Sequence, residues 1–186
     1  MAVPMTMPEA LAQDNLDDST AWCMDVLHGP FLRPGARSEV SKVALQQNAI
    51  IGLYFSASWC PPCRQFTEIL SDCYRTIQEN FGTQALEIVL IPRDRSQEEW
   101  EEYHRRMPFL SLQFEDKAVV RLKERFQVTR IPQLIFVTSA GELLTKEGRG
   151  EEMLGFGCDP VRVYKQLMRL AGLRAASPSQ DSNAST

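Results

Sequence analysis

The amino-acid sequence predicts an α/β domain in which a central mixed β-sheet is flanked by α-helices. Segments with strand-like patterns alternate along the chain with segments that have the apolar spacing of helices, and there is no internal repeat. The 186 residues, 44% of them hydrophobic, fall in the usual range for one domain with a packed core. The segment between the first two predicted strands is long enough to supply the helical crossover that parallel strands need.

The first two strands are predicted by short apolar segments, residues 49–56 and 86–92. Both are rich in residues that suit a pleated sheet, so we expect them to be buried. Residues 62–80 between them have apolar side chains at three- and four-residue spacing, which is typical of an amphipathic helix. The apolar face of this helix, which contains Cys73, should pack on the sheet.

Two further helices are predicted after the second strand. Ser96 with Glu99 has the spacing of a capping box, and the helix that it begins should end before Pro108. Asp116 can cap another helix that runs through Phe126. The first of these two helices would be a second crossover helix.

The last part of the domain is predicted to be a hairpin followed by a helix. Residues 133–138 and 142–145 flank a Ser-Ala-Gly turn and have strand-like composition. Asp159 is then followed by Pro160, which places an N-cap before the helical position that best tolerates proline. The helix should run to about Ala171.

We expect one domain, residues 21–172, between two tails. Residues 1–20 contain two prolines and an acidic stretch without hydrophobic period, which predicts a mobile N-terminal tail. Residues 173–186 are mainly small or polar, which predicts a disordered C-terminal tail.

Composition excludes several classes of partner. The net charge of -4 comes from interspersed acids and bases, so we expect neither nucleic acid nor an anionic membrane as a partner. No apolar run approaches the roughly 18 residues of a membrane span, and the first residues carry acids where a signal peptide needs a basic end. These observations predict a cytoplasmic location, with the nucleus as a second one. In such a reducing compartment, five irregularly spaced cysteines favour functional rather than stapling chemistry.

The central chemical feature is the pair Cys60 and Cys63, which lies between the first predicted strand and the helix after it. Residues three apart share a helix face, so the two thiols can close into a small disulfide ring and reopen. Free N–H groups and the positive end of the helix dipole should lower the pKa of Cys60, which makes it the attacking thiol. We expect Cys60 at the exposed edge of the sheet. Cys63 lies one turn inside and would resolve the mixed disulfide. Pro61 and Pro62 should restrict the loop to one shape.

Two alternatives remain for this pair: half of a zinc site, or two ordinary core cysteines. A structural zinc site needs four ligands, and the remaining candidates show no second paired spacing. Those candidates are Cys23, Cys73, Cys158, His28 and His104. We therefore expect no metal and no organic cofactor. Cys73 fits the buried stripe of its helix and Cys158 a loop, so both are predicted to be structural, whereas Cys23 would be an exposed thiol near the mobile start.

Ile131 and Pro132 form a second possible element of the site. A proline that begins an apolar strand is sometimes cis, because the X-Pro bond has only a small trans preference. The sequence pattern alone fits a cis and a trans proline equally well.

Residues 54–64 (YFSASWCPPCR) resemble the active-site segment of the tryparedoxins and nucleoredoxins. Residues 94–110 and 126–134 resemble two further segments of that family, in the right order and at the right separations. The similarity covers residues 49–150, and residues 141–149 are more similar to nucleoredoxin-like proteins than to tryparedoxin.

This resemblance implies a thioredoxin fold and a thiol-disulfide oxidoreductase that reduces protein or low-molecular-weight disulfides. It makes Cys60 the nucleophile and Cys63 the resolving thiol. It also makes Trp59 a wall of the site and Pro132 a cis-proline facing it, with the backbone of Ile131 offered to an extended substrate segment.

The sequence departs from ordinary thioredoxins at Tyr54, where their buried aspartate would lie. The acceptor for the proton of the resolving thiol is therefore not evident, and Tyr54 and Asp94 are the candidates for a proton relay. Asp94 follows the second predicted strand, whose end should face the site. Its alternative role is to cap or solvate the start of the next helix.

Two neighbours of the pair also have two interpretations each. Trp59 is either a core aromatic residue or a large apolar surface that shields the thiol and docks a partner, and we favour the second. Arg64 is either a solvated charge or a group that helps to hold a thiolate or an acidic partner.

The partners implied are disulfide-containing protein substrates and an external dithiol or reductase as electron donor. The rival hypothesis is a redox-regulated binding module, in which the pair changes oxidation state but the result is the docking of a signalling partner. Sequence does not separate turnover from such a switch.

Overall fold

The structure is a computed structural model that describes residues 26–172, except residues 28, 35–38, 151–152 and 155–156. The tails predicted at residues 1–20 and 173–186 lie outside the described residues. So do Cys23 and His28.

The described residues form a mixed seven-stranded sheet in the order β2-β1-β5-β4-β3-β6-β7. At its centre, β3 (Ile50–Ser56) pairs in parallel with β4 (Leu86–Pro92) and antiparallel with β6 (Gln133–Thr138). The strand β7 (Leu143–Thr145) extends one side as a hairpin with β6. The other side is completed by three two-residue strands, β5 (Leu110–Ser111), β1 (Phe31–Leu32) and β2 (Glu39–Val40).

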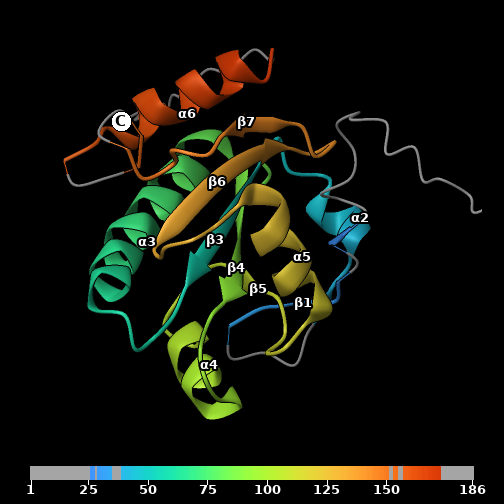
Figure 1. The fold of residues 1–186 in the computed structure, drawn as a ribbon. Coiled ribbons are helices and arrows are strands. Elements are labelled where there is room, and N and C mark those ends of the chain that lie inside the picture. Colours follow the sequence, from blue (N-terminus) through green and yellow to red (C-terminus); the bar gives the residue numbers. More distant parts are fainter. Residues whose placement is uncertain (1–25, 28, 35–38, 151–152, 155–156, 173–186) are drawn as a thin grey trace, which may run out of the picture.

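The central strands bury both faces because helices cover the sheet on each side (Figure 1). One face packs on α3 (Pro61–Phe81) and α6 (Pro160–Leu170), and the other on α5 (Lys117–Phe126) and α2 (Lys42–Leu45). Side chains alternate between the two faces, as a period of two requires: Ile50 and Tyr54 belong to the first core, and Ile51, Leu53 and Phe55 to the second. The short helix α4 (Gln97–His104) contributes Trp100 and Tyr103 to the first core.

The predicted α/β architecture is confirmed, and so are the three predicted N-caps. The side chains of Ser96, Asp116 and Asp159 accept hydrogen bonds from the first turns of α4, α5 and α6. The helix α4 ends at His104, earlier than Pro108. The elements that we did not predict are β1, β2, β5 and α2, which are two to four residues long and show no periodicity. No helix in this described part is long and apolar enough to cross a membrane.

Gly148 fixes the end of the β6–β7 hairpin against the central sheet. Its N–H donates to the carbonyl of Leu134 at 3.0 Å. A Cβ at this position would lie 2.8 Å from the Leu134 oxygen and 2.8 Å from the Phe136 ring. The backbone can approach β6 this closely because glycine has no side chain.

We expect Gly148→Ala to lower the free energy of unfolding by about 1–3 kcal/mol, as for other overpacked sites. Urea unfolding measures this, with Glu147→Ala as the control. Glu147 is exposed, so its substitution should change stability by less than about 0.5 kcal/mol. Equal stability of the two variants would show that the backbone at position 148 can move away from Leu134 and Phe136 without a loss of stability.

Candidate active site

Cys60 and Cys63 lie where β3 ends and α3 begins. Cys60 is the N-cap of α3 and Cys63 belongs to its first turn. The two residues form a disulfide with a Cα–Cα distance of 5.2 Å, within the usual range for such bridges. The expectation that this spacing allows ring closure at the helix start is confirmed.

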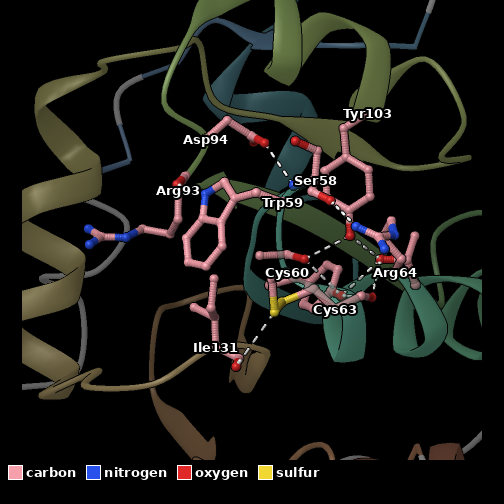
Figure 2. The surroundings of a disulfide bond; sticks show 12 residues. Ser58, Trp59, Cys60, Cys63, Arg64, Arg93, Asp94, Tyr103 and Ile131 are labelled. Carbon is pink, nitrogen blue, oxygen red and sulfur yellow. Dashed lines mark hydrogen bonds between the residues drawn. A yellow bond between two sulfur atoms is a disulfide. The ribbon is translucent and has the colours of Figure 1, made fainter.

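Cys60 is more buried than we predicted. The sequence placed it at an exposed edge, but only 5% of Cys60 is exposed and Cys63 is fully buried. The cover comes in part from a distant segment, since the carbonyl oxygen of Ile131 lies 3.9 Å from Cys60 Sγ (Figure 2). Trp59, which is 42% exposed, is the large apolar side chain that this region presents to solvent.

The helix end offers Cys60 fewer hydrogen-bond donors than we predicted. Pro61 and Pro62 occupy the first two helical positions and have no N–H. The N–H groups of Cys63 and Arg64 both donate to the Cys60 carbonyl, at 3.1 and 3.2 Å. In this disulfide form the helix end therefore acts on Cys60 mainly through the helix dipole. Such a dipole typically stabilises a nearby negative charge by about 0.3–1 kcal/mol. The two prolines in the sequence already contained this information.

The indole nitrogen of Trp59 forms a hydrogen bond, and part of the ring is exposed to solvent. Its Nε1–H donates to the carbonyl of Arg93 at 3.0 Å, and the guanidinium of Arg95 lies 4.8 Å from the ring centre. The interpretation of Trp59 as a core aromatic residue is therefore wrong. The ring is a fixed apolar surface beside Cys60.

Ser58 is bound on both sides of its backbone, and we call these two bonds the Ser58 clamp. Its N–H donates to Asp94 Oδ1 at 2.7 Å, and its carbonyl accepts from Arg64 Nη1 at 2.7 Å (Figure 2). Arg64 is thus more than a solvated charge. Asp94 does not cap the next helix, because Ser96 Oγ accepts the Glu99 N–H there. Both predicted alternatives for these residues missed the clamp, which joins segments far apart in sequence.

The two carboxyl oxygens of Asp94 have different surroundings. Asp94 Oδ2 is buried and has no hydrogen-bond partner among the described residues. Burial raises the pKa of Asp94, although the Ser58 N–H opposes this shift. The carboxyl points toward Ser58 in Figure 2.

Four buried hydroxyl groups, those of Tyr54, Ser56, Thr67 and Tyr103, form a hydroxyl cluster behind Cys63. Tyr54 and Thr67 both donate to the Cys63 carbonyl, at 3.1 and 2.9 Å. Tyr103 lies 2.6 Å from Thr67 Oγ1 and 2.9 Å from Ser56 Oγ, which in turn donates to Tyr54. Burial raises the pKa of Tyr54, so its phenol stays protonated. The cluster positions the backbone of Cys63 without any charge.

Sequence reasoning identified only Tyr54 of this cluster. Thr67 and Tyr103 did carry a signal, because each hydroxyl stands on the buried face of its own helix. A buried polar group needs a partner, so two such groups on neighbouring helices favour a shared hydrogen bond.

The peptide bond between Ile131 and Pro132 is cis, as the resemblance implied. Beside it lies a pocket of about 390 Å³, which we call the basic pocket. It is lined by Arg130, Ile131, Pro132, Gln133, Lys146, Glu147, Arg149 and Gly150. Three lining residues are basic and one is acidic, which leaves an excess of two positive charges.

The other two described cysteines lie together, which we did not predict. Cys73 Sγ on α3 is 3.4 Å from Cys158 Sγ, in the loop before α6. They are 85 positions apart, so no spacing rule links them. Among the residues that the structure describes, no group of three or more His, Cys, Asp or Glu side chains could hold a metal ion.

Comparison with known proteins identifies relatives for most of the chain. A thioredoxin-like family model matches residues 48–143. Nucleoredoxin from Xenopus laevis is 38% identical over 153 residues, which cover 81% of this chain and 36% of that protein. Tryparedoxin from Trypanosoma brucei brucei is 36% identical over 125 residues, which cover 62% of this chain and 83% of that protein. The chain therefore spans about a third of the length of the nucleoredoxins that it matches.

Solved structures agree with the fold described above. Native tryparedoxin I from Crithidia fasciculata is 35% identical with a TM-score of 0.59, and the match covers 67% of this chain and 85% of that one. A thioredoxin from Wuchereria bancrofti is 30% identical with a TM-score of 0.62, over 77% and 97% of the two chains. The predicted thioredoxin fold is confirmed.

We expect Asp94→Asn to become more stable relative to the unsubstituted protein as pH rises. The amide oxygen can still accept the Ser58 N–H but cannot ionise. Because burial raises the pKa of Asp94 in the folded state, its ionisation costs more there than in the unfolded chain. The penalty is absent below the ordinary aspartate pKa and grows as pH rises through the raised value.

The measurement is urea unfolding of both proteins from pH 4 to pH 7.5. Asp116→Asn is the control, since Asn also serves as an N-cap. A stability difference for Asp94→Asn that shrinks with rising pH would contradict the burial argument.

Proposed function

The chain belongs to the thioredoxin-like family that includes the nucleoredoxins and tryparedoxins, and on this premise we propose that it is a thiol-disulfide oxidoreductase with Cys60 and Cys63 as its reacting groups. One observation carries the proposal. A disulfide at the start of a helix lies directly beside a backbone carbonyl, that of Ile131, and an exposed aromatic ring, that of Trp59.

The proposed reaction is the reduction of a disulfide in two exchange steps. The Cys60 thiolate attacks one sulfur of the substrate, which forms a mixed disulfide and releases the first substrate thiol. The Cys63 sulfur then attacks Cys60, releases the second substrate thiol and leaves the Cys60–Cys63 disulfide. An external dithiol or a reductase returns two electrons and two protons to this disulfide. No metal or organic cofactor takes part in this scheme.

Substrate binding is assigned to Trp59, Ile131 and Pro132. The carbonyl of Ile131 lies close enough to Cys60 Sγ to place an extended substrate segment over the sulfur. Trp59 offers that segment a large apolar face that does not need to be ordered on binding, since Arg93 already fixes the indole nitrogen.

The proton of Cys63 needs an acceptor when its sulfur attacks. We assign this role to Asp94, because its Oδ2 is buried without a hydrogen-bond partner among the described residues and is left to accept a proton. Burial also raises the pKa of Asp94, which brings it closer to the pH at which a general base works well. Tyr54 is assigned a positioning role, since its hydroxyl donates to the Cys63 carbonyl. Asp94→Asn keeps an acceptor for the Ser58 N–H, so a loss of turnover in that variant would report on proton transfer.

The proposed substrates are disulfide-containing proteins and low-molecular-weight disulfides, and the proposed location is the cytoplasm, with the nucleus as a second one. Reducing compartments keep the dithiol available for another cycle. The charge pattern supports neither nucleic acid nor a membrane as a partner.

The basic pocket favours substrates that carry negative charge near the disulfide. Arg130, Lys146 and Arg149 form no ion pair with another described residue, so the excess positive charge of the pocket can attract an anionic ligand. Lys146 Nζ also donates to the Phe126 carbonyl at 3.4 Å, and the Arg149 guanidinium lies 5.8 Å from the centre of the Phe66 ring. Because the pocket adjoins Ile131 and Pro132, a carboxylate placed there would leave the substrate disulfide near Cys60.

Cys60→Ser should abolish reduction of a disulfide substrate, whereas Cys63→Ser should trap the substrate as a stable mixed disulfide. Attack needs the first thiol and release needs the second. The assay supplies a dithiol donor, follows the substrate disulfide, and detects trapped adducts by non-reducing electrophoresis.

Equal trapping by both variants would contradict these assignments. The redox-regulated binding module makes a different forecast for the unsubstituted protein. On that hypothesis, the unsubstituted protein would show no turnover with any dithiol or reductase. A partner would bind only one oxidation state of the Cys60–Cys63 pair.

Two single variants, Arg130→Glu and Arg149→Glu, each reverse one charge of the basic pocket. Each should lower kcat/KM for glutathione disulfide. An exposed ion pair contributes at most about 1 kcal/mol, and reversal replaces attraction with repulsion, so we expect a decrease of about threefold to tenfold. The cationic disulfide cystamine should show no decrease, and added salt should weaken the effect on glutathione disulfide.

The matched control is Arg162→Glu on the exposed surface of α6, which changes the net charge equally but lies outside the basic pocket. If all three substitutions act alike on glutathione disulfide, the pocket does not select substrates by charge.

A further inference from the structure

Among the residues that the structure describes, two thiols outside the proposed active site lie in van der Waals contact. Cys73 is 5% exposed and projects from the middle of α3, while Cys158 is half-buried and directly precedes Asp159, the N-cap of α6. Their sulfur atoms are 3.4 Å apart. A disulfide would require these atoms to approach by about 1.4 Å.

We propose that Cys73 and Cys158 are a second redox site of this protein, which closes reversibly into a disulfide between α3 and the start of α6. Two unlike thiols make up the site. Burial, and secondly the adjacent Cys158, raise the pKa of Cys73, so Cys73 stays a thiol at neutral pH. Cys158 is the more accessible of the two, and it meets an oxidant first.

The oxidant is a low-molecular-weight disulfide. Cys158 attacks one of its sulfur atoms, which forms a mixed disulfide and releases one small thiol. The Cys73 sulfur then attacks the Cys158 sulfur, and the proton of Cys73 passes to the second small thiol as it leaves. Two protein thiols have then been oxidised and one small disulfide has been reduced to two thiols. A dithiol reverses the reaction.

The second site is separate from the Cys60–Cys63 pair. Cys73 stands ten residues after Cys63 on α3, which corresponds to about 15 Å along the helix. The two pairs cannot exchange electrons directly over that distance. The proposal therefore does not depend on turnover by Cys60 and Cys63.

Closure would fix the position of α6. In the reduced form, packing contacts such as that between the rings of Phe81 and Tyr164, 4.5 Å apart, hold α6 against α3. A covalent bond at Cys158 would fasten the start of α6 and also one end of the connection from β7. That connection contains Lys146, Glu147 and Arg149 of the basic pocket.

The test uses the full chain with Cys23→Ser, which removes the fifth cysteine. The reduced protein is treated with glutathione disulfide, the remaining thiols are blocked, and unreduced peptides are analysed by mass spectrometry. We expect a peptide pair that joins Cys73 to Cys158, and the loss of four thiols per chain. With Cys158→Ser added, only the two thiols of Cys60 and Cys63 should be lost.

Thermal unfolding supplies an independent measurement. Oxidation should raise Tm by roughly 5–10 °C more in the Cys23→Ser protein than in the same protein with Cys158→Ser, because the bridge closes a long loop. Cys73→Ala serves as a second variant that adds no polar group to the core. A persistent glutathione adduct on Cys158, unreacted Cys73 and Cys158 thiols, or an equal Tm shift in all variants would each overturn the proposal, whatever the activity of Cys60 and Cys63.

Discussion

The site depends on one backbone constraint, the turn that joins β3 to α3. The strand ends at Ser56 and the helix begins at Pro61, so four residues must redirect the chain and deliver Cys60 to the helix end. The Ser58 clamp holds this turn from both sides, with Asp94 from the end of β4 and Arg64 from α3 itself. Because the turn is fixed by its neighbours, the positions of both sulfur atoms follow from the packing of the sheet and the helix.

The sequence was most informative where the physical signal is local. The strand from Ile50 to Ser56 and the caps at Ser96 and Asp159 are set by nearby residues, and so is the Cys60–Cys63 spacing. The two-residue strands β1 and β5 form only because distant strands pair with them, and they leave no periodicity in the sequence. The cover over Cys60 has the same origin, since it comes from the segment around residue 131.

The two cysteine pairs illustrate this difference within one protein. The partners in the first pair are three residues apart and share one helix end, so their contact could be predicted without knowing the fold. Those in the second come from α3 and from the loop before α6, and they meet only because α6 packs on α3 over the same face of the sheet. Their distance is a property of tertiary packing, which periodicity alone does not reveal.

The hydroxyl cluster determines how the surroundings of Cys63 respond when a charge forms there. A carboxyl group at position 54 would carry a charge that depends on pH. Hydroxyl groups instead carry dipoles whose hydrogens can rotate, and the Tyr103 hydroxyl has two acceptors within reach, Ser56 and Thr67. The network can therefore exist in two proton arrangements with the same heavy-atom positions and the same total charge. It acts as a small polarisable medium, which can reorient around a transient thiolate as solvent does, although its own residues are almost entirely buried.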